Sequence, residues 1–174
     1  MRARPHLPIV LCALLAVSYA GPAGAGSLTG SAGSARFNID VTSMREARFH
    51  ETVRQQYDFS CGSAALATVL SHHYDEPTGE KGVFDSMWRA GDPELIRTRG
   101  FSLLDMKTFL EGRGYEANGF RVPLDRLSEA GIPGIVLINL RGYLHFVVVK
   151  DVTDTEVLVG DPAIGLNRYD RETF

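Results

Sequence analysis

The spacing of the apolar residues changes near Gly114, and this change constrains the fold more than any other feature of the sequence. Before Gly114, apolar residues recur at intervals of three and four, which is typical of amphipathic helices. After Gly114, short runs rich in β-branched residues predict strands. Helices followed by antiparallel strands favour an α+β domain, with N-terminal helices packed on a C-terminal antiparallel sheet.

Local signals give the expected bounds of these elements. Ser60 is expected to cap a helix, and Pro93 stands at the first position of a later one. Ser102 and Asp105 form a capping box for a further helix. The expected helices cover 60–70, 83–88, a short segment from 92, 103–110 and 123–129, and the expected strands cover 115–122, 134–140, 143–151 and 155–160.

The first 25 residues have the pattern of a secretory signal peptide. Arg2 and Arg4 give a positive start, and residues 7–20 are mostly apolar. Ala23-Gly24-Ala25 then offers small residues for cleavage, with Ser18-Tyr19-Ala20 as a second option. An uncleaved membrane anchor and an ordinary N-terminus are the alternatives, although the apolar stretch is short for a permanent span. We therefore expect an exported protein.

Length and charge limit the number of domains and the kinds of partner. The 174 residues suffice for one domain and not comfortably for two. We expect a signal peptide over 1–25, a flexible Gly-, Ala- and Ser-rich linker over 26–45, and one folded domain over 46–174. The net charge is -3 without a basic run, so no nucleic-acid partner is expected. No stable membrane span is expected after signal cleavage.

Cys61 would be the only cysteine left after signal cleavage, because Cys12 is removed. Exported compartments favour disulfides, but a lone thiol cannot form an internal one. Cys61 is therefore buried and inert, paired between chains, or reactive. Its position in the first turn of an expected helix favours a thiolate, because unpaired N–H groups and the positive end of the helix dipole lie there. A small buried core residue is the alternative.

His145 lies in an apolar strand, and Asp161 lies at the end of the next strand. Taken alone, His145 reads as a core histidine and Asp161, before Pro162, as a turn residue. In a hairpin with its turn centred on Thr153, opposed residue numbers add to 306, so 145 faces 161; a two-residue turn at Thr153-Asp154 shifts this by one. Opposed Cβ atoms lie about 4.5–5.5 Å apart, so the carboxylate can orient the imidazole as in a catalytic triad.

Four short features follow one another in a specific order. They are Gln55, Cys61-Gly62 six residues later, His145-Phe146 and Asp161-Pro162. This ordered set, within residues 53–163, resembles the bacteriocin-processing cysteine peptidases. Those are papain-like domains that cleave leader peptides after a double glycine and are often fused to ABC exporters. The resemblance implies a papain-like fold and a thiol protease that hydrolyses peptide bonds.

The resemblance also implies roles for individual residues. Cys61 would be the nucleophile, His145 the general base and acid, and Asp161 the residue that orients His145. Gln55 would donate to the oxyanion, helped by the N–H of Cys61. Gln56 competes for this role, but Gln55 has the six-residue offset of the family; a solvated loop residue is the other interpretation of Gln55. The expected substrate is a peptide or protein with a Gly-Gly or Gly-Ala site, and no metal or organic cofactor is implied.

Some features depart from the family pattern. Ser60 stands where an acidic residue often precedes the cysteine, and neither transporter segments nor a GxxxxGK[ST] motif is present. With a signal peptide, these features resemble stand-alone exported members, which implies a periplasmic location and a secretion apparatus as partner. Relatives usually continue a little beyond the position of Phe174, which bears on stability more than on chemistry.

Three other functions are compatible with the same residues. One is a non-cleaving accessory that docks peptides for a secretion system, and another is a structural accessory in which the catalytic set is a remnant. The intact set of Cys61, His145 and Asp161 favours an enzyme over both. A papain-like acyl transferase is the third, because hydrolysis and transfer pass through the same thioester.

Overall fold

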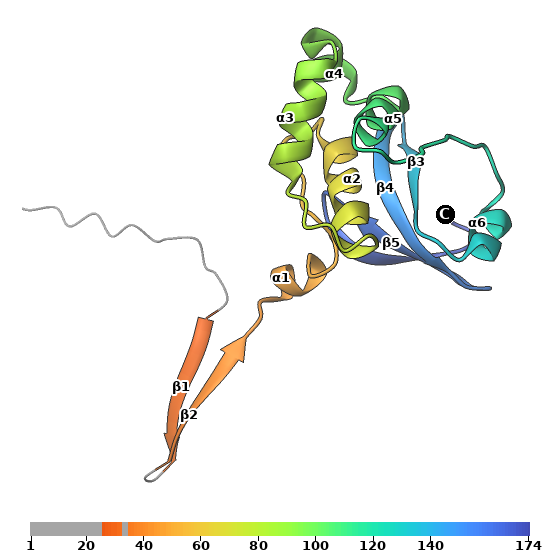
Figure 1. Cartoon of the computed structure of the whole chain (residues 1–174). Helices are drawn as coiled ribbons and strands as arrows, with labels where there is room; N and C mark the ends of the chain where they lie inside the picture. Colours follow the sequence, from red (N-terminus) through yellow and green to blue (C-terminus); the bar gives the residue numbers. More distant parts are fainter. Residues whose placement is uncertain (1–25, 33–34) are drawn as a thin grey trace, which may run out of the picture. The chain divides into compact units, whose positions relative to one another are not determined.

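The computed structural model describes residues 26–32 and 35–174. The chain divides into two units, with the boundary after Val41. The expected signal peptide, residues 1–25, lies outside the described residues. In the smaller unit, β1 (Gly26–Ala32) and β2 (Ala35–Val41) form an antiparallel hairpin (Figure 1). A flexible linker was expected here. The strict alternation of Phe37, Ile39 and Val41 with polar residues accounts for the strands instead.

The larger unit contains helices followed by a sheet, so the predicted α+β class is confirmed (Figure 1). The strands are antiparallel neighbours in chain order, β3-β4-β5-β6. The helices are α1 (Met44–Arg48), α2 (Cys61–His72), α3 (Glu80–Ala90), α4 (Pro93–Arg99), α5 (Leu103–Glu111) and α6 (Leu124–Ala130). The strands are β3 (Gly134–Leu140), β4 (Tyr143–Val152), β5 (Glu156–Asp161) and β6 (Gly165–Asp170).

Helix starts follow the local signals with one exception. The capping box of Ser102 and Asp105 is present, and Asp92 caps α4, in which Pro93 is the first residue. Ser60 stands at the N-cap position of α2, but its hydroxyl donates to the carbonyl oxygen of Tyr57 instead of capping the helix. The prediction of a Ser60 cap is therefore wrong, and α2 begins without a capping side chain. No helix in residues 26–32 and 35–174 is long and apolar enough to cross a membrane.

The expected strand over residues 115–122 is wrong. This segment is irregular, and hydrogen bonds with side chains of other segments hold it in place of strand pairing. Lys107 Nζ donates to the carbonyl oxygen of Ala117 at 2.5 Å, and the Tyr115 hydroxyl donates to Glu76 at 2.6 Å. Within the larger unit, two elements were not predicted, α1 and β6. The sequence of β6 lacks a clear apolar alternation, and the strand owes its place to pairing with β5.

The pairing of β4 with β5 contains a β-bulge. Val149 opposes Val159 and Asp151 opposes Leu158, so Lys150 has no partner in β5. The turn also lies later than expected, since the N–H of Thr153 donates to the carbonyl oxygen of Glu156 at 2.8 Å. Opposed numbers beyond the bulge therefore add to 308 instead of 306.

Helices cover both faces of the sheet around β4. On one face, α2, α3 and α5 share a core with Phe146 and Val148 of β4. On the other face, Val147 and Val149 pack with β5 valines and with α6. Each fully buried valine contributes about 1.5–3 kcal/mol of transfer free energy. This packing fixes the first residue of α2 beside the start of β4.

Candidate active site

Cys61 is the first residue of α2 and is 5% exposed. Its Sγ accepts a hydrogen bond from the backbone N–H of Phe146 in β4 at 3.5 Å. The next residue, Gly62, permits this approach, because an added Cβ would lie 3.2 Å from Cβ of Phe101 and 3.5 Å from the Phe146 ring. The sulfur therefore lies at the backbone of the strand that carries His145, although 85 residues separate Cys61 from Phe146.

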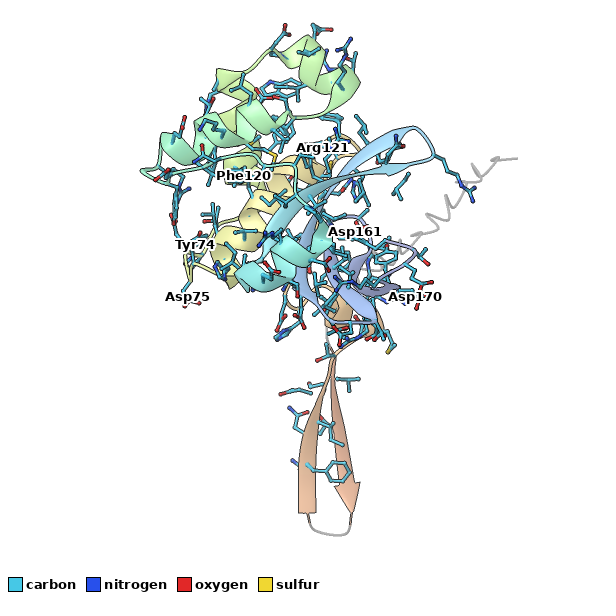
Figure 2. The ribbon with its side chains drawn as sticks, turned by 90° about the vertical axis from the view of Figure 1, so that its right-hand side faces the viewer. Tyr74, Asp75, Phe120, Arg121, Asp161 and Asp170 are labelled. Carbon is cyan, nitrogen blue, oxygen red and sulfur yellow. The ribbon has the colours of Figure 1, made fainter. Side chains whose placement is uncertain are left out.

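His145 and Asp161 form a buried pair, 2% and 4% exposed. His145 Nε2 lies 2.9 Å from Asp161 Oδ1, which also accepts the N–H of Ala163 at 2.7 Å. Figure 2 shows Asp161 on the strand side of this unit, among the side chains of β4 and β5. The other ring nitrogen of His145, Nδ1, is buried and has no hydrogen-bond partner within the described ranges. Because Asp161 occupies Nε2, Nδ1 is the nitrogen left for Cys61.

The charge state of His145 depends on these two neighbours. Burial lowers the pKa of His145 and is the largest single effect. Asp161, through its hydrogen bond and its charge, and the nearby Cys61 act in the opposite direction and together raise the pKa to about 9. The imidazole is therefore protonated at neutral pH, as a cation between a carboxylate and a sulfur.

Gln55 is held beside the turn that follows Asp161. Its backbone N–H donates to the carbonyl oxygen of Pro162 at 3.0 Å, and its Nε2 donates to that of Tyr57 at 3.0 Å. One Nε2 hydrogen is used by Tyr57, so the second is available. The partly buried Gln55 contrasts with the exposed Gln56, and this difference favours Gln55 as a site residue.

Comparison with known proteins decides the family. The model of the Peptidase C39 family matches residues 50–174. This chain belongs to the peptidase C39 family. The prediction of a cysteine-type peptidase is thereby confirmed. The probable functional amyloid protease FapD of Pseudomonas aeruginosa is 43% identical over 161 residues, which are 92% of this chain and 71% of FapD.

Solved structures share the fold of this C39 peptidase. The peptidase domain of Streptococcus ComA, a bifunctional ABC transporter of a quorum-sensing pathway, aligns with a TM-score of 0.60 and 21% identity, over 71% of this chain and 88% of that domain. A double glycine motif protease from an AMS/PCAT transporter, solved with its leader peptide, aligns with a TM-score of 0.55 and 24% identity, over 70% of this chain and 79% of that chain. The papain-like fold expected from the resemblance is confirmed.

One residue of the site in this C39 peptidase escaped sequence reasoning. The ring of Tyr143 stacks on the imidazole of His145, with centroids 5.9 Å apart and planes at 27°. Its hydroxyl donates to the carbonyl oxygen of Asp58 at 2.7 Å. The one available signal was its position two residues before His145, which puts both side chains on one face of a strand.

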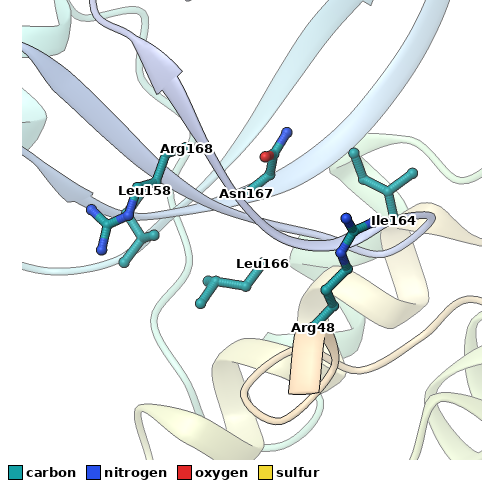
Figure 3. Close-up of a pocket in the computed structure, with 6 residues that line it drawn as sticks. All are labelled: Arg48, Leu158, Ile164, Leu166, Asn167 and Arg168. Atoms are coloured by element: carbon teal, nitrogen blue, oxygen red, sulfur yellow. The ribbon is translucent and has the colours of Figure 1, made fainter. Parts of the chain in front are cut away.

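A pocket of about 520 Å³ lies apart from these residues in the C39 domain (Figure 3). Neither Cys61, His145, Asp161 nor Gln55 lines it. Its lining combines α1 with the β5–β6 hairpin: Arg48, Leu158, Ile164, Leu166, Asn167 and Arg168. The candidate catalytic residues were therefore located by their contacts and not by a hollow in the surface.

Proposed function

We propose that this C39 peptidase hydrolyses peptide bonds after double-glycine-type sites in an exported or secreted protein. Cys61 is the nucleophile, His145 the general base and acid, Asp161 the residue that orients His145, and Gln55 the side-chain oxyanion donor. One observation carries the proposal: the Cys61 sulfur contacts the strand of His145, and the far nitrogen of His145 contacts Asp161. This arrangement supports a triad of nucleophile, base and orienting group.

The reaction proceeds through a thioester. The Cys61 thiol gives its proton to Nδ1 of His145, and the resulting thiolate attacks the scissile carbonyl carbon, so that a carbon–sulfur bond forms while the carbonyl oxygen becomes an oxyanion. When this intermediate collapses, the carbon–nitrogen bond breaks, and Nδ1 of His145 gives its proton to the leaving amine. His145 then takes a proton from water, the hydroxide attacks the thioester, and Cys61 is released.

The start of α2 supports an oxyanion hole beside Cys61. Ser60 makes no side-chain cap, so no side chain takes up the N–H groups of the first turn. Backbone N–H groups at a helix start are suitable donors for a developing negative charge. The second Nε2 hydrogen of Gln55 would complete the pair of donors.

The relatives and the N-terminus support the substrate and the location. The transporter protease with a similar fold was solved with a leader peptide and is described by its double glycine motif. FapD is described as a probable functional amyloid protease. Together with the signal-peptide pattern of residues 1–25, these likenesses support a periplasmic peptidase that acts beside a secretion apparatus.

Purified protein and synthetic peptides test the assignment. We expect wild-type enzyme to cut peptides with an internal Gly-Gly and to leave peptides with Leu-Leu at that position intact, and Cys61→Ala to cut neither. Gln55→Ala should lower kcat by about a hundredfold, as loss of an oxyanion donor does. The matched control, Gln56→Ala, should retain kcat.

The same assay separates the alternatives. Cleavage that persists in Cys61→Ala would refute the triad. Peptide binding without cleavage by either protein would indicate a docking accessory. Cleavage performed with added hydroxylamine, analysed by mass spectrometry, would reveal an acyl transferase if the product carries the amine in place of water.

A further inference from the structure

Tyr143 connects the two halves of the candidate site. It is the first residue of β4, and its ring stacks on His145 while its hydroxyl donates to the carbonyl oxygen of Asp58 at 2.7 Å. Asp58 lies three residues before Cys61, in the loop that leads into α2. A single side chain therefore touches the base directly and the loop of the nucleophile through a hydrogen bond.

We infer that Tyr143 is a positioning residue that fixes the distance and orientation between His145 and Cys61. The inference rests on the proposed roles of Cys61 and His145, and it goes beyond them because it assigns catalytic geometry to a residue outside the triad. The hydroxyl bond holds the start of β4 to the loop before α2, and the ring covers one face of the imidazole.

The local structure explains why the start of β4 needs such a contact. Tyr143 follows the tight turn between β3 and β4, where Arg141 and Gly142 have positive φ values of 54° and 95°. This turn is held within the hairpin, as Asn139 Oδ1 accepts the N–H of Gly142 at 2.6 Å. The hydrogen bond from Tyr143 to Asp58 joins residues 85 positions apart and connects the tip of the β3–β4 hairpin to the loop before α2.

Two simpler roles for Tyr143 make different predictions. As a core residue it would be buried, yet it is 50% exposed. As a contact for substrate alone it would leave its hydroxyl for the peptide, yet the hydroxyl donates to a backbone carbonyl. Partial burial of the hydroxyl, with smaller contributions from Cys61, Asp58 and Asp161, raises the pKa of Tyr143, so this hydroxyl keeps its proton and remains a donor.

The test compares Tyr143→Phe and Tyr143→Ala with a matched control, Tyr115→Phe. Tyr115→Phe also removes a hydroxyl hydrogen bond, the one that Tyr115 donates to Glu76 at 2.6 Å in a different part of the domain. Three quantities are measured: the rate of Cys61 alkylation by iodoacetamide, followed by peptide mapping; kcat and KM for a Gly-Gly peptide; and the midpoint of thermal unfolding. Iodoacetamide is too small to need peptide contacts, so its rate reports on the arrangement of sulfur and imidazole.

We expect Tyr143→Phe to lower the alkylation rate and kcat by about fivefold each, the size of one net hydrogen bond, with KM unchanged. Tyr143→Ala should lower kcat further, because the ring is lost as well. Tyr115→Phe should leave alkylation and kcat at the wild-type level, even where it lowers the unfolding midpoint.

Other outcomes would overturn the inference. If Tyr143→Phe raises only KM and alkylates at the wild-type rate, Tyr143 is a substrate contact. If Tyr115→Phe slows alkylation equally, the effect is general destabilisation. Failure of the proposed function has a separate signature, since cleavage would then survive in Cys61→Ala whatever the Tyr143 variants do.

Discussion

Nε2 of His145 lies 2.9 Å from Oδ1 of Asp161, although the sheet register sets the two residues on a diagonal. Beyond the bulge, residue 161 continues the register opposite 147, and 145 is the next residue on the same face. Between the bulge and the turn, opposed residue numbers add to 309. If that register continued along β4, residue 161 would lie opposite 148, and His145 would lie on the other face. The bulge accommodates the extra residue Lys150 and so keeps residue 161 on the face of His145.

Deletion of Lys150 should preserve this contact. The deletion removes the residue that has no partner, so Asp151–Leu158 and Val149–Val159 become consecutive pairs and residue 161 stays opposite 147. We expect kcat/KM for a Gly-Gly peptide to stay near the wild-type value, because His145 and Asp161 remain on one face of the sheet. Circular dichroism monitors the fold of the variant.

The control for this deletion is Lys150→Ala, which keeps the bulge. It removes the ion pair of Lys150 with the exposed Glu51, worth at most about 1 kcal/mol of stability. Its kcat/KM should stay near the wild-type value. A fall of about a hundredfold in the deletion variant, with Lys150→Ala unaffected, would contradict this register.

Asp161→Asn should lower the pKa of His145. Burial lowers this pKa, and the hydrogen bond of Asp161 is the largest of the effects that raise it to about 9, with Cys61 and the charge of Asp161 adding to it. An asparagine oxygen can still accept the N–H of Ala163, so the turn should remain. We expect kcat/KM to fall, and its decline at alkaline pH to begin about one pH unit lower or more. A pH profile measures this, with the exposed Asp170→Asn as control; coincident profiles for all three proteins would contradict it.

His145 should also make stability depend on pH. Its pKa rises from an ordinary value of 6.5 to about 9 on folding, so folding favours the protonated form. This stabilisation is fully present below pH 6.5 and is lost as pH rises towards 9. Urea unfolding across this range should show a falling free energy of unfolding for the wild type and a flatter dependence for His145→Gln. Equal slopes would mean that His145 is not charged in the folded protein.

Gly62→Val should destabilise the domain. An added Cβ at Gly62 lies 3.2 Å from Cβ of Phe101, and the further methyl groups of valine must displace the core. We expect a loss of about 1–3 kcal/mol in the free energy of unfolding, measured by urea titration. Gly82→Val in α3 is the matched control, because nothing lies within 4 Å of a Cβ there. Equal stability of the two variants would contradict the close packing of α2 on this core.

Much of the fold followed from local sequence signals. The capping box of Ser102 and Asp105 and the strand over 134–140 appear as expected, because caps and β-branched runs act within a few residues. The expected strand over 115–122 failed because contacts from Lys107 and to Glu76, which are distant in sequence, hold that segment. The alternation around Phe37 was itself a local signal for the β1–β2 hairpin.

The sequence by itself determined which residues were candidates for chemistry: one of its two cysteines, at a helix start, a histidine on a strand, and an aspartate at the end of the next strand. It also predicted that Asp161 reaches His145, but from a register in which the two residues are directly opposed, and the structure has them on a diagonal. The run from Phe146 to Val149 is apolar at every position, so no alternation reveals the register or the bulge. Only the tertiary structure decided the β4–β5 register that sets His145 and Asp161 on a diagonal. It also decided that Tyr143 reaches the loop before Cys61, because this contact joins segments 85 residues apart that no local signal links.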